Sequence, residues 1–255
     1  MSRSIKIIVI ALLALIAFKP AKCQDKKEMT VKLTEPAKAG KLDVEIFNGT
    51  INVVGYSGTD VIVSYKGIYY PINSNQNPGN IDAKDASKKD SNLDVSQADN
   101  VVKIVVEKPR IVDLVIKVPR NFSVVLKNLT AGDIKVANVN GDHEISMAAG
   151  NITMSNISGS VSAHTNKGNI KVDMNSVKKG TPLAFSNVGG IIEVGLPLTL
   201  KANVKLQTEF GKANSEFDVE PKSSAGNLIT GKINGGGAEI LMKSIGGDIY
   251  LRKTK

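Results

Sequence analysis

The chain has 255 residues, a formal net charge of +9 and a hydrophobic content of 42%, with one cysteine and no tryptophan. This length is enough for one large core, and a single cysteine excludes a fold held together by internal disulfides. The positive charge is spread along the chain without a clustered basic stripe or a recognisable nucleic-acid-binding module, so we expect no nucleic-acid partner.

The first 23 residues have the three parts of a secretory signal peptide. Arg3 and Lys6 provide a basic start, and residues 7–18 form an apolar run that is too short to span a bilayer permanently before the segment ends at Cys23. Residues 1–23 hold four basic and no acidic residues, so their predicted removal lowers the net charge from +9 to +5 and leaves no integral membrane segment. Acylation of Cys23 instead of its removal stays open, as does the destination, which is periplasmic, cell-surface or secreted.

Residues 24–40 form a polar lead-in with room for one short strand. Alternating apolar residues then predict β-strands from residue 41 onward, with a turn at Asn48-Gly49. Residues 71–92 are a polar loop, long enough to be functional or mobile. The strands predicted before the central repeat cover residues 42–46, 51–53, 61–65, 93–95, 101–107, 112–118 and 123–127.

A nine-residue repeat follows. It is marked by the glycines Gly132, Gly141, Gly150, Gly159 and Gly168. Apolar residues recur at twice this period, as in Ile134, Ile152 and Ile170. A fixed short period with matching apolar columns predicts stacked coils, each of which buries its apolar face on the next.

We therefore predict an all-β, single-domain parallel β-solenoid (β-helix) over residues 41–255. Its short strands are expected in coils of about 18 residues, with irregular capping strands before residue 128 and regular coils after it. Gly190 repeats the motif 22 residues after Gly168, which predicts a four-residue insertion at 178–181.

Asx residues follow the repeat glycines at Asp133, Asn151 and Asn169, and a second set lies at Asn138 and Asn156. Such columns suit either a calcium or sugar site or a ladder that satisfies backbone groups at the corners. We favour the structural ladder, because the calcium-binding nonapeptide pattern needs an aspartate in every repeat.

The two histidines do not indicate a metal site. His143 shares a column with Val161 and is expected to point inward, whereas His164 is expected on the outer face. No cysteine or acidic cluster accompanies either histidine, so we expect no metal and no cofactor.

No catalytic motif is evident, and we predict that the protein is not an enzyme. There is no G-x-S-x-G elbow, and the outward positions of the repeat lack the paired carboxylates that a polysaccharide-active β-helix enzyme needs. For binding, the most distinctive candidates are Tyr69 and Tyr70, which lie beside Tyr65 and the polar loop. The alternative for Tyr69 and Tyr70 is that they pack the loop against one end of the solenoid.

Taken in order, these segments resemble the bacterial adhesin-like β-strand-repeat family DUF4097, which is related to the DUF2807 head-domain group. The matching segments are residues 42–56, 112–128, 132–172, 189–213 and 235–253. The resemblance implies an exported, non-enzymatic β-solenoid of the cell envelope that acts as an adhesin-like binding or structural module on an unknown protein or glycan. A periplasmic scaffold or envelope-stress component is the alternative. The family supplies no catalytic residues.

Overall fold

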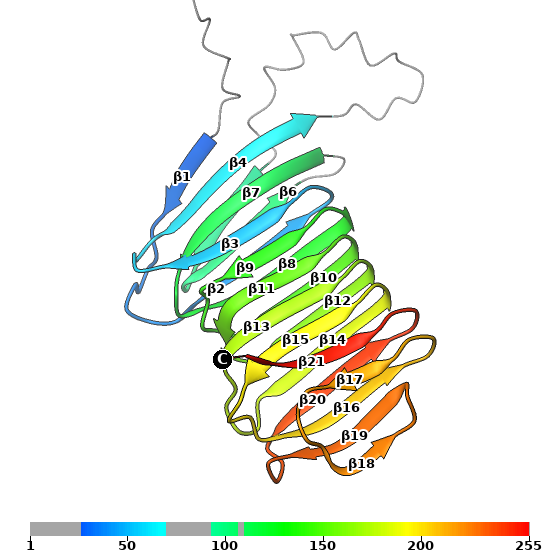
Figure 1. The fold of residues 1–255 in the computed structure, drawn as a ribbon. Coiled ribbons are helices and arrows are strands. Elements are labelled where there is room, and N and C mark those ends of the chain that lie inside the picture. The colour runs from blue at the N-terminus through cyan, green and yellow to red at the C-terminus, as the bar shows by residue number, and fades with distance from the viewer. Residues whose placement is uncertain (1–26, 70–92, 107–109, 255) are drawn as a thin grey trace, which may run out of the picture.

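The computed structural model describes residues 27–69, 93–106 and 110–254. Within these ranges the chain is all β, and two sheets face each other across one apolar core (Figure 1). Both predictions, of an all-β chain and of a parallel solenoid, are confirmed.

The ten-stranded sheet, called sheet A, forms one wall of the solenoid. In spatial order its strands are β1 (Lys27–Val31), β4 (Val61–Tyr69), β7 (Arg110–Pro119), β3 (Ile51–Tyr56), β9 (Ile134–Ala137), β11 (Ile152–Ser158), β13 (Ile170–Ser176), β15 (Ile192–Pro197), β21 (Ile249–Thr254) and β17 (Ala213–Ser215).

The eleven-stranded sheet, called sheet B, forms the other wall. In spatial order its strands are β18 (Glu220–Ser224), β19 (Leu228–Ile233), β16 (Ala202–Thr208), β20 (Ala238–Ser244), β14 (Pro182–Gly189), β12 (Val161–Lys167), β10 (His143–Ala149), β8 (Phe122–Ala131), β2 (Gly40–Ile46), β6 (Val101–Val106) and β5 (Leu93–Ala98).

The central coils stack in the register that the repeat predicts. Ile152 pairs with Ile134 on one side and with Ile170 on the other, each 18 residues away. Ile170 then pairs with Ile192, so the next coil is 22 residues long and the insertion lies between β13 and β14 as predicted. These isoleucines are fully buried, and each contributes about 1.5–3 kcal/mol relative to an exposed side chain.

Glycines keep one corner of the stack compact. At Gly150 φ is +126°, and a Cβ added there would lie 1.7 Å from the carbonyl oxygen of Gly132. Gly168 has φ of +138° and would place its Cβ 2.0 Å from the carbonyl oxygen of Gly150. Only glycine reaches these backbone angles readily and allows coils to approach this closely. The recurrence of glycine in the sequence is therefore a steric requirement of the stack.

The Asx column that starts at Asp133 is a backbone ladder, as predicted, whereas Asn138 and Asn156 are linked side chain to side chain. The Asp133 carboxylate accepts the Asn151 backbone N–H at 2.9 Å, and the Asn151 side chain accepts the Asn169 N–H at 3.0 Å. The Asn169 side chain then accepts the N–H of Ile191 at 2.8 Å. Each side chain thus satisfies the corner of the next coil, which is the use that short polar side chains have in turns.

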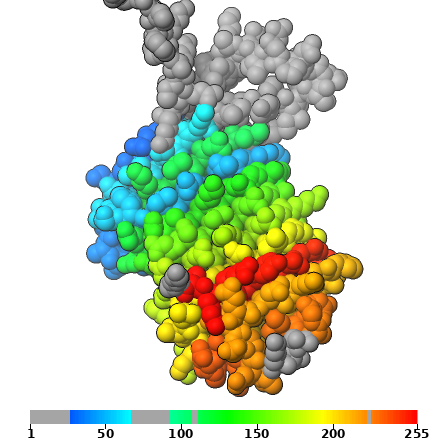
Figure 2. All heavy atoms as spheres, viewed as in Figure 1, coloured from blue at the N-terminus to red at the C-terminus, as the bar shows by residue number. Residues whose placement is uncertain are grey.

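The order of the coils in space differs from their order in the chain at both ends. The pair β2–β3 lies between β6–β7 and β8–β9, and the C-terminal pair β20–β21 lies between β14–β15 and β16–β17. In Figure 2 the red C-terminal residues accordingly form a band between the yellow-green and the orange ones.

Antiparallel strands close the stack at both ends. Among the described strands, the antiparallel pairs are β1–β4, β4–β7 and β5–β6 at one end, and β16–β19 and β18–β19 at the other. The predicted division at residue 128, with irregular capping strands before it and regular coils after it, is therefore wrong in two respects. The strands β2, β3, β6 and β7 already stack in parallel, and antiparallel strands also cap sheet B after residue 128, where the sheet would otherwise offer an open edge.

Candidate functional site

The structure leaves the predicted tyrosine site untested. Tyr69 is the last residue of β4 and pairs with Arg110 of β7 at one end of sheet A. Its side chain, Tyr70 and the polar loop 71–92 lie outside the described part of the chain. Tyr65 is described, and it packs against the core.

The two histidines lie on the faces that the sequence analysis predicts. His143 is only 2% exposed and faces the core. His164 lies on the outer face of sheet B, where its ring nitrogens are 2.8 Å from Ser186 Oγ and 3.0 Å from Asn166 Oδ1. Within the described ranges no group of three or more His, Cys, Asp and Glu side chains could hold a metal ion.

The most unusual surface feature is an apolar corner near the C-terminal end of the stack, where the chain passes from sheet B to sheet A. We call it the corner ridge, and it consists of Val188, Ile191, Phe210 and Ile245. Phe210 is 83% exposed, while Val188 and Ile191 are 44% and 43% exposed. A cluster of large exposed apolar side chains on a soluble surface indicates an interaction site.

Backbone hydrogen bonds hold the ridge in place. The Gly246 N–H donates to the Val188 carbonyl at 2.8 Å, and the Phe210 N–H donates to the Ile245 carbonyl at 2.9 Å. Val188 of β14 and the residues that directly follow β20 and β16 therefore occupy successive rungs of one corner. Gly246 has no side chain that could cover the ring of Phe210, which is consistent with the high exposure of that ring.

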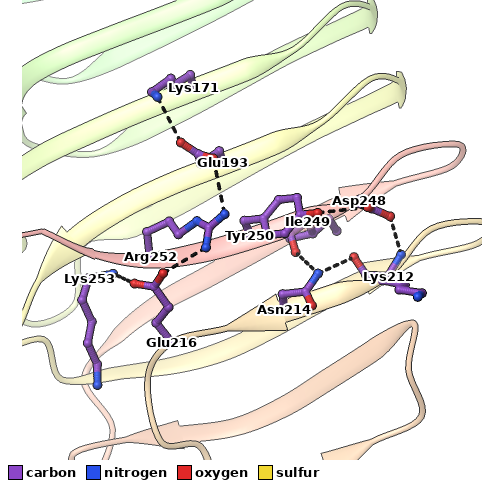
Figure 3. Close-up of polar contacts among 10 residues, drawn as sticks. All are labelled: Lys171, Glu193, Lys212, Asn214, Glu216, Asp248, Ile249, Tyr250, Arg252 and Lys253. Atoms are coloured by element: carbon purple, nitrogen blue, oxygen red, sulfur yellow. Dashed lines mark hydrogen bonds and ion pairs between the residues drawn. The ribbon is translucent and has the colours of Figure 1, made fainter.

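A network of charged residues lies on the outer face of sheet A (Figure 3). Glu193 is 3.1 Å from Lys171 Nζ and 3.8 Å from an Arg252 nitrogen, and Arg252 Nη1 donates to Glu216 at 2.9 Å. Arg252 also lies over the Tyr250 ring, 4.6 Å from its centroid. Exposed ion pairs of this kind stabilise a fold by only about 0.2–1 kcal/mol, so their main effect is to fix the directions of the side chains.

Asp248 connects the network to the ridge. Its carboxylate accepts the Tyr250 hydroxyl at 3.1 Å and the Lys212 backbone N–H at 2.8 Å, and Lys212 is two residues from Phe210. Figure 3 shows Tyr250, Asp248 and Lys212 converging where β21 and β17 begin. Tyr250 and Arg252 are thus joined through Asp248 to the segment that carries Phe210.

The hydrogen bonds of the network also shift the pKa values of its members. The Lys253 backbone N–H and Arg252 hold the pKa of Glu216 below its usual value. The hydrogen bond to Asp248 raises the pKa of Tyr250, and the bond to Glu193 raises that of Lys171. Each shift keeps the group in its ordinary form at neutral pH, whereas a general acid such as a catalytic glutamic acid needs a raised pKa.

Sequence reasoning missed this surface. It assigned no role to Phe210. A signal is present in the sequence, because Phe210 occupies the column position that Lys167 and Gly189 hold in neighbouring coils. A large aromatic residue at a corner position that other coils fill with small or charged residues indicates an outward projection.

The geometry defines the chain as an all-β solenoid. It has an apolar corner ridge and a charged network on the outer face of sheet A. A family model described as Toastrack DUF4097 matches residues 16–252, and the chain belongs to this family. No curated protein matches the chain.

A solved structure shares the fold, and a second is more distantly similar. A proposed cell adhesion protein from Clostridium sporogenes has a TM-score of 0.54 at 14% sequence identity, over 90% of this chain and 100% of that chain. A proposed adhesin from Bacteroides fragilis has a TM-score of 0.43 at 14% identity, over 91% of this chain and 98% of that chain. At these identities the likeness concerns the fold. In the described part of the chain, no helix is long and apolar enough to cross a membrane.

Proposed function

We propose that the protein is an exported, non-enzymatic, adhesin-like module of the cell envelope that binds a partner protein through the corner ridge. The family membership, the relation in fold to a proposed cell adhesion protein and the predicted signal peptide 1–23 all support this proposal. The stacked coils suit the role, because continuous ladders give a stiff support that holds the contact surface in one shape.

The exposure of Phe210 is the observation that carries the proposal. Binding hot spots are enriched in tyrosine, tryptophan and arginine at the centre of a patch that becomes fully desolvated, and aromatic rings supply large contact areas. Tyr250 holds Arg252 over its ring and is joined through Asp248 to Lys212, two residues from Phe210, so this pair is already arranged before a partner binds. Preorganisation of this kind lowers the entropic cost of association.

A periplasmic scaffold would use the same ridge on a different partner. The carboxylates of this surface favour a binding function over that of a polysaccharide-active enzyme. Glu193 and Glu216 both form ion pairs with Arg252, so neither is a free acid–base group.

The Phe210→Asp substitution is expected to abolish adhesion. Beads coated with the purified protein are scored on surfaces of mucin, fibronectin and collagen and on intact bacterial cells. We expect binding to at least one surface, and a loss of at least about tenfold for Phe210→Asp, because hot-spot residues contribute this much. Folding is expected to be unchanged, since the ring makes few contacts.

Leu198→Asp is the matched control. Leu198 is also an exposed apolar residue, at 59%, but it lies just beyond the opposite end of β15 from Ile191. It is expected to leave bead binding intact. Equal losses in both variants, full binding by Phe210→Asp, or no binding to any surface would each contradict the proposal.

A further inference from the structure

A hollow opens in sheet A where the ends of β13 and β15 separate. The two strands are paired only as far as Asp173 with Gly195, whereas β15 stays paired with β21 up to Pro197 with Thr254. The hollow has a volume of about 370 Å³, and its lining comes from the ends of β13, β15 and β21 and from the residues that directly follow β15.

Pro197 explains why the two strands separate. The Ile170 N–H donates to the Ile191 carbonyl, so the odd-numbered residues of β15 direct their backbone groups toward β13, as alternate residues do in a parallel ladder. Residue 197 has the same direction, but proline has no N–H to donate. The next rung, in which the Met174 carbonyl would accept that N–H, therefore cannot form.

Asp173 leans over Gly195 at the edge of the hollow. Gly195 lies on the outer face of sheet A in register with Asp173, and a Cβ added to it would lie 2.5 Å from Asp173 Oδ1 and 2.6 Å from Thr254 Cγ2. Both side chains thus use space that any other residue at 195 would fill. The nearby Lys171 ammonium is paired with Glu193 at 3.1 Å, and Asp173 has no hydrogen bond or ion pair among the described residues.

The remaining lining is rich in acceptors. The Asn175 amide nitrogen donates to Asn156 Oδ1, which leaves the Asn175 oxygen as an acceptor. The hydroxyls of Thr199 and Thr254 also line the hollow and can accept. The Pro197 ring supplies an apolar surface, and no lysine or arginine is among the described residues that line the hollow.

We propose that this hollow binds a small molecule that carries a primary ammonium group on a short aliphatic chain. An ammonium has three N–H donors and no acceptor, so it matches a free carboxylate surrounded by oxygen acceptors, and hydrogen bonds between charged groups are the strong ones. The aliphatic chain would cover the Pro197 ring and remove apolar surface from water.

A calcium ion fits the hollow less well than an organic cation. Calcium collects several oxygen ligands and is usually held by more than one carboxylate, whereas Asp173 is the single carboxylate among the described lining residues. The hollow lies at the opposite end of β15 from the corner ridge, so this inference does not depend on the proposed function.

Titration of ¹⁵N-labelled protein with hexylammonium chloride, followed by NMR, tests the inference. We expect shifts of the amide signals of residues 173–175 and 195, with a dissociation constant of about 1 mM or below. Asp173→Asn keeps the shape of the side chain and is expected to weaken binding by at least about tenfold, because it removes the charge. Gly195→Ala should also weaken binding, because its Cβ displaces the Asp173 carboxylate.

Asp43→Asn is the matched control, because it makes the same change on β2, in the other sheet. It should leave the affinity within about twofold. Hexanol has the same chain without the charge and is expected to bind at least about tenfold more weakly. The inference is overturned if hexylammonium causes no shifts up to about 10 mM, if hexanol binds equally well, if calcium or acetyl-Ala-Lys-Ala-amide binds more tightly, or if Asp173→Asn binds like the parent protein.

Discussion

Replacing Gly150 by alanine is expected to destabilise the protein by at least about 4 kcal/mol, near the upper end of single-substitution effects. The backbone at Gly150 has φ of +126°, and the new Cβ would lie 1.7 Å from the carbonyl oxygen of Gly132. The neighbouring atom is backbone and cannot move aside without parting the coils. Because folded domains are stable by only about 5–15 kcal/mol, equilibrium unfolding in urea should show a large loss, or the variant should fail to accumulate as folded protein.

Gly189→Ala is the control for this prediction. A Cβ at Gly189 meets no atom within 4 Å, although Gly189 directly precedes the corner glycine Gly190. We expect a change within about 0.5 kcal/mol. Similar stabilities for Gly150→Ala and Gly189→Ala would show that the glycine column does not set the approach of the coils.

Replacing His143 by valine is expected to stabilise the protein by about 1–3 kcal/mol at neutral pH. His143 is 2% exposed, and neither ring nitrogen has a hydrogen-bond partner. A buried polar group without a partner costs free energy. Its neighbours in register, Val124 and Val161, show that valine fits the same column. Urea unfolding at pH 7.5 measures the gain, and a loss of stability would contradict this explanation.

The same residue should make the protein sensitive to acid. Burial lowers the pKa of His143 to about 4 from 6.5, although the nearby Ser160 carbonyl and Asp142 carboxylate act weakly in the opposite direction. Between these values the unfolded chain binds a proton that the folded chain does not. Stability therefore falls as the pH drops from about 6.5 to about 4, by about 3 kcal/mol, and the contribution stays constant outside this range.

The pH profiles of two variants check the assignment. His143→Val should lose this part of the acid sensitivity, whereas His164→Gln, on the outer face, should keep it. Urea midpoints at pH 7.5, 6.0 and 4.5 are sufficient for the comparison. An unchanged profile in His143→Val would show that other groups cause the loss.

The regular part of the fold could be predicted from sequence because its cause is local and repeated. Stacked parallel coils need the same residue type at the same place, so Ile134, Ile152 and Ile170 recur with the coil length. Glycine recurs for the same reason at the tight corners. The insertion before β14 was also visible, since it only changes the spacing from 18 to 22 residues.

The order of the outer coils could not be predicted in this way. Residues 249–251 and 213–215 both continue the same apolar column, and the repeat alone does not say which of them stacks on β15. The choice depends on long-range pairing, in which β19 covers one side of β16 while β20 takes the other. Patterns within one strand do not contain this information.

The candidate site depends on the same long-range order. Phe210 becomes part of a ridge only because β20 lies between β14 and β16, which brings Val188, Ile245 and Phe210 onto successive rungs. Sequence reasoning therefore turned to Tyr69 and Tyr70, which are close in sequence.

Accessibility of the protein on intact cells of its host tests the central claim most directly. Cells that produce the protein are treated with protease, and its loss is followed by immunoblot beside a periplasmic control protein. An adhesin-like module is predicted to be degraded while the control stays intact. Protection of the protein until the envelope is permeabilised would contradict the adhesin-like assignment and favour a scaffold within the periplasm.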